Sequence, residues 1–259
     1  KFLAAAGALG LVAFLSPGNT VRLDVVETPK PSSSLSNVAI DRLLDLIRNL
    51  FPSNIVAAHV YTALTGDLSM YVMAFLAAVA LHGLLVLPTL YLFLTHRQLG
   101  PFFRNMVYPL SVALGTSSSS ATAPTLIMSM EQGLRMDPSL ARFLVPVGAT
   151  MNMDGTAIYF IVTVLFFAQK NNIAFTFGEH LVVGLMCCLA TLNTSPSPQA
   201  GRVVLVYLMT SLGIPLDGIG ILLYTDWIMN RLSTAVNVLG DAVVASGTQE
   251  LCRATLPTG

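Results

Sequence analysis

Long apolar blocks make up most of this chain, and the polar interruptions inside them mark its predicted elements. The stretch 70–95 contains His82 and no residue that is charged at neutral pH. About 20 consecutive apolar residues are enough for an α-helix to cross the hydrocarbon core of a bilayer. The pattern therefore predicts a membrane-spanning helix at 70–95.

Two later blocks are split by small polar residues into arms that are too short to cross a bilayer. The apolar arms, each of about ten residues, flank Gly115–Thr122 in the block 106–130 and Thr191–Pro198 in the block 181–213. Irregular backbone at membrane depth is tolerated only where it is buried in protein or lines a cavity. The pattern therefore predicts two re-entrant helical hairpins with polar tips.

Each predicted hairpin is followed by a long helix that carries polar residues. The helix 143–169 is interrupted at Asn152–Gly155, where glycine and polar side chains favour an unwound turn, and the helix 218–246 carries Asn237 and Asp241. Because the order of hairpin and polar helix occurs twice, the chain shows the inverted repeats and broken helices that are typical of secondary transporters. We predict an all-α membrane protein.

The first 69 residues differ from the rest of the chain. The apolar run Phe2–Leu15 is too short to span a bilayer and is expected to be the end of a membrane helix. The proline- and serine-rich segment 16–37 is expected to be a solvent loop. In 38–51 the apolar residues fall on one helical face, which predicts an amphipathic helix at an interface. We therefore divide the chain into two parts, 1–69 and 70–259.

The composition supports the membrane class. Hydrophobic residues make up 54% of the 259 residues and charged residues 10%, against about 25% charged residues in typical soluble domains. We therefore expect a multi-pass membrane protein. The formal net charge of zero gives no indication of nucleic-acid binding, and the three cysteines give no disulfide framework.

Two pairs of polar residues are candidates for ion coordination: Asn152 with Asp154 in the interrupted helix, and Asn237 with Asp241 on one helical face. Sodium prefers hard oxygen ligands from carboxylates, amides and unwound backbone carbonyls, and the carbonyl of Gly148 near the break could join them. The alternative is that these groups only bond to neighbouring helices, which is the commoner role of a single asparagine. Two aspartates without a cation four residues away favour ion coordination.

The serine run Ser117–Ser120 stands where the second arm of the first hairpin is predicted to begin. A helix N-terminus attracts anions, so a substrate carboxylate could bind there. A close-packed tip of small residues is the alternative. A nucleophilic serine is a third interpretation, but the chain has no G-x-S-x-G motif and its four histidines lie far away in sequence. We therefore do not expect an enzyme.

Five segments together form a specific set of motifs. They are Gly115–Thr122 (GTSSSSAT), Pro146–Thr156 (PVGATMNMDGT), Pro198–Gly201 (PQAG), Asn237–Asp241 (NVLGD) and Asp41–Asn54 (DRLLDLIRNLFPSN). The set resembles the dicarboxylate/amino acid:cation symporter family of glutamate and neutral amino acid transporters, over about 70–250 and near 40–56. The resemblance implies sodium-coupled symport in the plasma membrane by a homotrimer, with 70–259 as the transport domain and 1–69 as a remnant of the scaffold.

The resemblance also implies roles for individual residues. One sodium site is matched by Gly148, Asn152, Asn237 and Asp241. A second is matched by Thr150 and Met153 with the carbonyls of Thr191, Leu192 and Thr194, and part of a third by Asn152 and Asp154. The substrate-contacting positions are matched by Ser117, Ser118, Ser119, Thr156, Ser197, Pro198, Gln199, Ala200, Gly201, Asn230, Ser233, Thr234 and Asn237. In the family, the second hairpin acts as a gate.

Some positions depart from the family pattern. Ser233 replaces the arginine that binds the side chain of glutamate, which favours a small neutral substrate. Asn230 replaces the carboxylate that binds the substrate ammonium, and Phe160 replaces the glutamate that carries a proton, which argues against proton coupling. The second tip, Asn193–Pro198, has prolines in place of glycines, which stiffens the gate. Arg202 is either an interface arginine or a relocated substrate anchor.

The chain also lacks helices that the family pattern contains. The resemblance implies that two membrane helices are missing between about Val60 and Leu68 and two more at the amino end, and we therefore expect most of the trimerisation scaffold to be absent. We expect sodium-coupled symport of small neutral amino acids. The alternative is a truncated, non-transporting member that binds ions or modifies a partner subunit.

Overall fold

The computed structural model describes residues 2–15, 58–216 and 219–253, and all regular structure in these ranges is helical. The elements are α1 (Phe2–Leu15), α3 (Ala58–Leu81), η1 (His82–Val86), α4 (Leu87–Thr95), α5 (Leu99–Thr116), α6 (Ser119–Met128), η2 (Ser129–Gly133), α7 (Pro138–Met151), α8 (Asp154–Lys170), α9 (Phe177–Ala190), η3 (Thr191–Asn193), α10 (Gly201–Ser211) and α11 (Gly220–Leu251). The prediction of an all-helical chain is confirmed for these residues. The predicted loop 16–37 and amphipathic helix 38–51 lie outside them, and the division of the chain at residue 69 stays a prediction.

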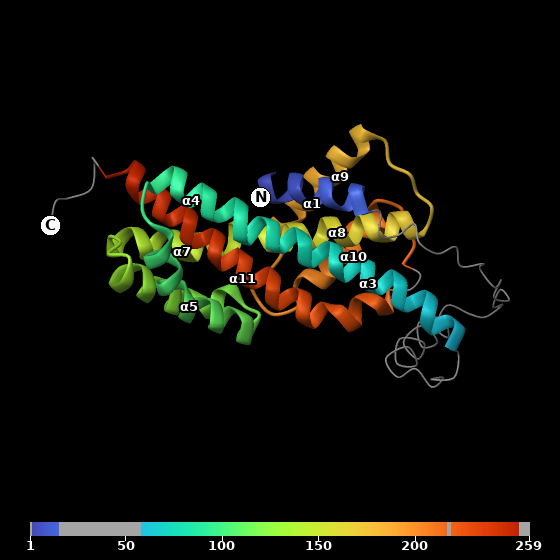
Figure 1. Ribbon diagram of the computed structural model, residues 1–259, viewed down its shortest axis with the longest axis horizontal. Helices are drawn as coiled ribbons and strands as arrows, with labels where there is room; N and C mark the ends of the chain where they lie inside the picture. Colours follow the sequence, from blue (N-terminus) through green and yellow to red (C-terminus); the bar gives the residue numbers. More distant parts are fainter. Residues whose placement is uncertain (1, 16–57, 217–218, 254–259) are drawn as a thin grey trace.

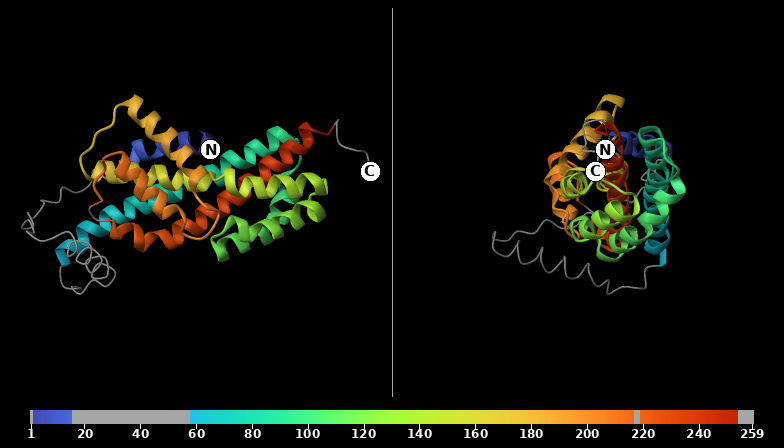
Figure 2. Two further views of the ribbon diagram at one scale, coloured as in Figure 1. Left: turned by 180° about the vertical axis from the view of Figure 1, so that it is seen from behind. Right: turned by 90° about the vertical axis from the view of Figure 1, so that its left-hand side faces the viewer.

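The helices form an elongated bundle in which most axes run near the long dimension of the molecule (Figure 1 and Figure 2). The helix α8 forms its centre, because every residue from Ala157 to Ala168 is buried and α1, α3, α9 and α11 pack against it. The long helix α11 continues past α8 and also packs against α4, α5 and α7. It therefore connects two apolar clusters, one around α8 and one at the end formed by α4 to α7.

A π-turn joins α3 to α4 in one long helix (Figure 1). The π-turn η1 begins at His82 and ends at Val86, two residues before Pro88, which lacks the N–H that would bond to the preceding turn. This helix contains the predicted span 70–95 but begins at Ala58. The segment Val60–Leu68, where the family pattern has two further helices, is therefore continuous helix.

Helix caps place several boundaries earlier than the apolar pattern indicated. The helix α7 begins before residue 143 because Asp137 Oδ1 accepts hydrogen bonds from the backbone N–H groups of Ser139 (2.9 Å) and Leu140 (3.1 Å). The helix α9 begins before residue 181 because Thr176 and Glu179 form a capping box. The residues that start these helices are thus polar residues that lie outside the apolar blocks.

Each polar interruption predicted from the sequence contains a break between two helices. The helix α5 ends at Thr116 and α6 begins at Ser119, α7 ends at Met151 and α8 begins at Asp154, and η3 with a turn separates α9 from α10. Among the described residues, the stretches Leu68–Thr95 and Pro138–Lys170 have the length and composition to cross a membrane. Re-entry of the two hairpins into a bilayer stays a prediction.

Candidate functional site

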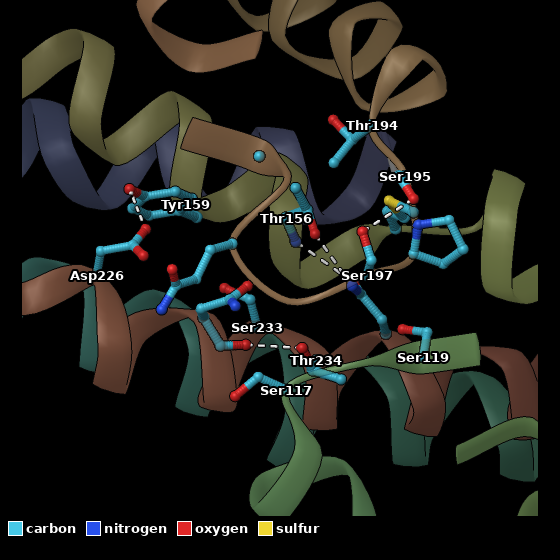
Figure 3. Close-up of a pocket in the computed structure, with 16 residues that line it drawn as sticks. Ser117, Ser119, Thr156, Tyr159, Thr194, Ser195, Ser197, Asp226, Ser233 and Thr234 are labelled. Carbon is cyan, nitrogen blue, oxygen red and sulfur yellow. Dashed lines mark hydrogen bonds between the residues drawn. The ribbon is translucent and has the colours of Figure 1, made fainter. Parts of the chain in front are cut away.

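Two segments between helices face each other across a small polar pocket. We call 117–118 the first tip and 194–200 the second tip. The first turns of α8 and one face of α11 complete its wall (Figure 3). Hydroxyl and amide groups predominate, and Asp226 is the only charged residue of the lining within the described chain. The lining residues are Ser117, Ser119, Met153, Thr156, Tyr159, Thr194, Ser195, Pro196, Ser197, Gln199, Gly201, Asp226, Asn230, Ser233, Thr234 and Asn237.

The pocket is closed in this conformation. The space free for water-sized molecules is about 20 Å³, and a single water needs about 10–15 Å³, so there is room for a water molecule and not for an amino acid. The hydroxyls of Ser118 and Ser120 donate to the carbonyl oxygen of Pro196 at 2.8 and 3.2 Å, and the Ser120 N–H donates to the same oxygen at 3.4 Å. An amino acid can therefore bind only if the two tips separate.

Each tip contains one non-glycine residue with left-handed backbone. Ser117 has a φ of 53° and Gln199 a φ of 62°. This conformation costs about 1–2 kcal/mol for a residue with a Cβ, and such strained residues concentrate at ligand sites and switch regions. Both residues line the pocket, so the strained backbone lies at the place where the tips must move.

Asn237 fastens α11 to the start of α8. Its Oδ1 accepts hydrogen bonds from the N–H groups of Gly155 (2.7 Å) and Thr156 (3.3 Å), and its Nδ2 donates to Thr156 Oγ1 (3.0 Å). The first N–H groups of a helix have no partner within it, so Asn237 satisfies two of them from another helix. A Cβ at Gly155 would lie 2.2 Å from the carbonyl oxygen of Ser233, and only glycine permits this approach.

Two polar atoms on the pocket face of α11 have no hydrogen-bond partner in the part of the chain that the structure describes. They are Asn230 Nδ2 and Ser233 Oγ, and both are buried. Leaving such a group unsatisfied costs about 1–3 kcal/mol. Because both residues line the pocket, a bound ligand can supply the missing partners.

Most of the predicted substrate-contacting residues come together at this pocket. The exceptions are Ser118, Pro198 and Ala200, which do not line it. Ser118 belongs to the first tip, but its hydroxyl caps α6 and donates a hydrogen bond to Pro196 of the second tip. Contact with a substrate stays a prediction for the whole set.

Four lining residues were not among the predicted site residues: Ser195 and Pro196, which lie within the predicted second tip, and Tyr159 and Asp226, which helical spacing could have identified. Tyr159 lies three residues after Thr156, and Asp226 lies four residues before Asn230. Residues three or four apart share one face of a helix. Each of the two residues therefore extends a predicted face of the pocket by one turn.

The predicted ion-binding residues around Asp241 lie against each other. Asn152 Nδ2 donates a hydrogen bond to Asp241 Oδ1 at 3.2 Å. A Cβ at Gly148 would lie 2.6 Å from Asp241 Oδ1, and one at Gly240 would lie 3.1 Å from Asp154 Oδ2. Because these glycines leave the space open, the carboxylates of Asp154 and Asp241 and the amide group of Asn152 lie close to the backbone of α7 and α11. Carboxylate, amide and backbone carbonyl groups supply the hard oxygen ligands that sodium prefers.

Asp154 is also paired with His82. His82 Nε2 lies 3.2 Å from Asp154 Oδ2, and both side chains are buried. His82 is therefore packed between helices. Its carboxylate partner was not found from the sequence because Asp154 lies 72 residues further along the chain.

The residues predicted for a second ion site are less closely assembled. Met153 and Thr194 both line the pocket, and η3, which contains the buried Thr191, packs against α7. By contrast, Leu192 is 49% exposed, and the exposed hydroxyl of Thr150 donates to a carbonyl of its own helix at 2.9 Å. The role of this set stays a prediction.

The sequence model of the sodium:dicarboxylate symporter family matches residues 56–251, which include the whole pocket and all the predicted ion-binding residues. The chain belongs to this family. It is 40% identical over 186 residues to human excitatory amino acid transporter 5, covering 72% of this chain and 33% of the relative. It is 39% identical over 194 residues to excitatory amino acid transporter 1 of Ambystoma tigrinum, covering 75% and 36%.

Membership of the sodium:dicarboxylate symporter family confirms the resemblance inferred from the motifs. This family consists of membrane transporters rather than enzymes, which agrees with the expectation of a non-enzyme. The chain spans about one third of the length of these relatives. Their names refer to excitatory amino acids and give no support to the predicted preference for neutral ones.

Proposed function

We propose that this chain carries out sodium-coupled symport of amino acids across a membrane and prefers small neutral amino acids. The observation that carries the proposal is the polar pocket, which is closed by two tips and lies beside the carboxylates of Asp154 and Asp241 and the amide of Asn152. Membership of a sodium symporter family supports sodium as the coupled ion. The substrate preference rests on the side chains of the pocket.

The pocket suits the two charged groups of a free amino acid, and its lining offers no cation for a third, negatively charged group. The helix α6 begins at Ser119, and a helix N-terminus is a site for a carboxylate. The side-chain oxygens of Asn230 and Thr234 on α11 are acceptors for an ammonium group. The lining, within the described chain, includes no lysine or arginine. A side-chain carboxylate would therefore lose its hydration without gaining a cation.

Sodium would bind to Asn152, Asp241 and the backbone at Gly148, and a further ion to the region of Asp154. A cation there offsets the cost of burying these carboxylates. The same helices carry the pocket, because Asn237 joins the start of α8 to α11. Coupling between two ligands is reciprocal, so sodium strengthens substrate binding by the factor by which substrate strengthens sodium binding.

Uptake by the full chain reconstituted in liposomes tests the proposal. We expect accumulation of labelled alanine or serine with external sodium and none when choline replaces sodium, with weaker uptake of glutamate. Asp241→Asn should abolish the sodium-dependent signal because it removes a charged ligand. The control Glu131→Gln changes a carboxylate paired with Arg142 near the surface and should leave uptake unchanged.

The outcomes separate the parts of the proposal. No sodium-dependent uptake of alanine, serine or glutamate would contradict symport by this chain. Stronger uptake of glutamate than of alanine would contradict the neutral preference and leave symport standing. Sodium-dependent binding without uptake would favour a non-transporting role.

The surface supports a location in a membrane, which we propose to be the plasma membrane. Large apolar side chains on the outer face of α4 and the π-turn before it are exposed, among them Leu84 (68%) and Phe93 (74%). Contiguous exposed apolar surface marks contact with lipid or another protein. Alkaline carbonate extraction should leave the chain in the membrane pellet, and the mass of the detergent-solubilised particle tests assembly as a homotrimer.

A further inference from the structure

The charged residue of the pocket lining, Asp226, is part of a buried ion pair. Its side chain is 2% exposed, and both carboxylate oxygens have partners. Oδ1 accepts a hydrogen bond from the Tyr159 hydroxyl at 2.8 Å (Figure 3), and Oδ2 accepts one from Arg202 Nε at 2.5 Å. The carboxylate is thus matched by one hydroxyl and one cation.

Arg202 reaches this carboxylate from the second hairpin. It follows Gly201, which lines the pocket, and its side chain is 30% exposed. An interface arginine directs its guanidinium to the aqueous boundary, whereas Arg202 turns toward a buried aspartate and is itself absent from the lining. A cation therefore lies next to the pocket, but Asp226 compensates its charge.

The unsatisfied polar groups of the pocket lie on the same face of α11. Asn230 and Ser233 follow Asp226 by one and two turns, and neither Asn230 Nδ2 nor Ser233 Oγ has a partner in the described part of the chain. The amide nitrogen needs an acceptor, and the hydroxyl can donate or accept. An uncharged hydroxyl or amide group of a substrate satisfies both atoms without requiring a counter-charge.

We propose that the Arg202–Asp226 pair determines specificity: by keeping the cation compensated, it restricts the pocket to amino acids with an uncharged side chain, among which those with a hydroxyl or amide group gain hydrogen bonds. This proposal rests on the proposed function, because it requires an amino acid to bind here. Loss of the negative charge at Asp226 leaves Arg202 as a free cation beside the pocket. Opposite charges attract strongly where water is excluded, so the preference then moves toward an acidic side chain.

The ratio of asparagine affinity to aspartate affinity tests the proposal, because the two ligands have nearly the same shape and differ in charge. Binding is measured on the full chain in lipid nanodiscs with saturating sodium. We expect the wild type to favour asparagine and Asp226→Asn to lower the ratio by about tenfold or more. The double variant Arg202→Gln/Asp226→Asn, which lacks both charges, should return the ratio toward that of the wild type.

If the unpaired Arg202 prevents Asp226→Asn from folding, the reciprocal variant Arg202→Gln still tests the proposal. Arg202→Gln leaves an uncompensated carboxylate, so the affinity for 2,4-diaminobutyrate relative to asparagine should rise by about tenfold. Thermal unfolding shows which variants are folded, and Glu131→Gln, at a separate ion pair, should leave every ratio within about twofold. Unchanged ratios in the folded charge variants, or a wild type that favours aspartate, would overturn the proposal. No binding of any of these amino acids to the wild type would instead contradict the proposed function.

Discussion

At the scale of single residues, the glycines beside the buried carboxylates leave little room for a side chain. A Cβ at Gly148 would lie 2.6 Å from Asp241 Oδ1, so Gly148→Ala displaces the carboxylate or its helix. We expect the sodium concentration that half-maximally raises the unfolding temperature to increase at least tenfold, or about 1.4 kcal/mol. Gly100→Ala is the control, since a Cβ there meets nothing within 4 Å. An equal sodium response in both variants would contradict the assignment.

The same scale shows what a sequence can predict about a site. The predicted ion-binding residues of α7 and α11 lie together because each motif places its polar residues on a helix face that packs inward. The pairs His82–Asp154 and Arg202–Asp226 were not predicted, since their members are 72 and 24 residues apart. Such pairs depend on how separate helices pack, and no spacing within one helix indicates that packing.

At the scale of elements, Arg231 holds the first tip against α11. Its Nη1 donates to the carbonyls of Leu114 (2.6 Å) and Gly115 (2.9 Å) at the end of α5, where a cation also interacts favourably with the helix dipole. Arg231→Gln should therefore speed amide exchange in 114–118 about fivefold, which corresponds to about 1 kcal/mol. Arg142→Gln is the matched control, and equal exchange in both variants would contradict this role for Arg231.

The elements themselves were largely predictable, and their ends were not. The apolar blocks located the long helices, and the polar interruptions located the segments between them. The starts of α7 and α9 were missed because Asp137 and the Thr176–Glu179 capping box lie in polar segments that the apolar pattern assigned to loops. A capping residue stabilises a helix through a few backbone N–H groups, and hydrophobic periodicity does not report it.

At the scale of the whole molecule, the pocket and the ion-binding residues share two helices. The helix α8 begins between them, and α11 supplies Asn237 and Thr234 to the pocket and Asp241 to the ion-binding residues. A shift of either helix therefore acts on both sites at once. This short path gives the proposed coupling of sodium and substrate a physical basis within the described residues.

The contact between the two tips is the part of this arrangement that must open. The Ser118 hydroxyl donates to Pro196 at 2.8 Å, so Ser118→Ala removes about 1 kcal/mol of tip-to-tip stabilisation and should raise the open fraction about fivefold. The reporter is Ser233→Cys at this buried position, in a Cys252→Ser background where the other cysteines are buried. Adding Ser118→Ala should raise the rate at which maleimide labels this cysteine about fivefold as well. Ser111→Ala is the control because its hydroxyl bonds only within α5. Equal labelling rates in the two variants would show that the tips are held together by other contacts.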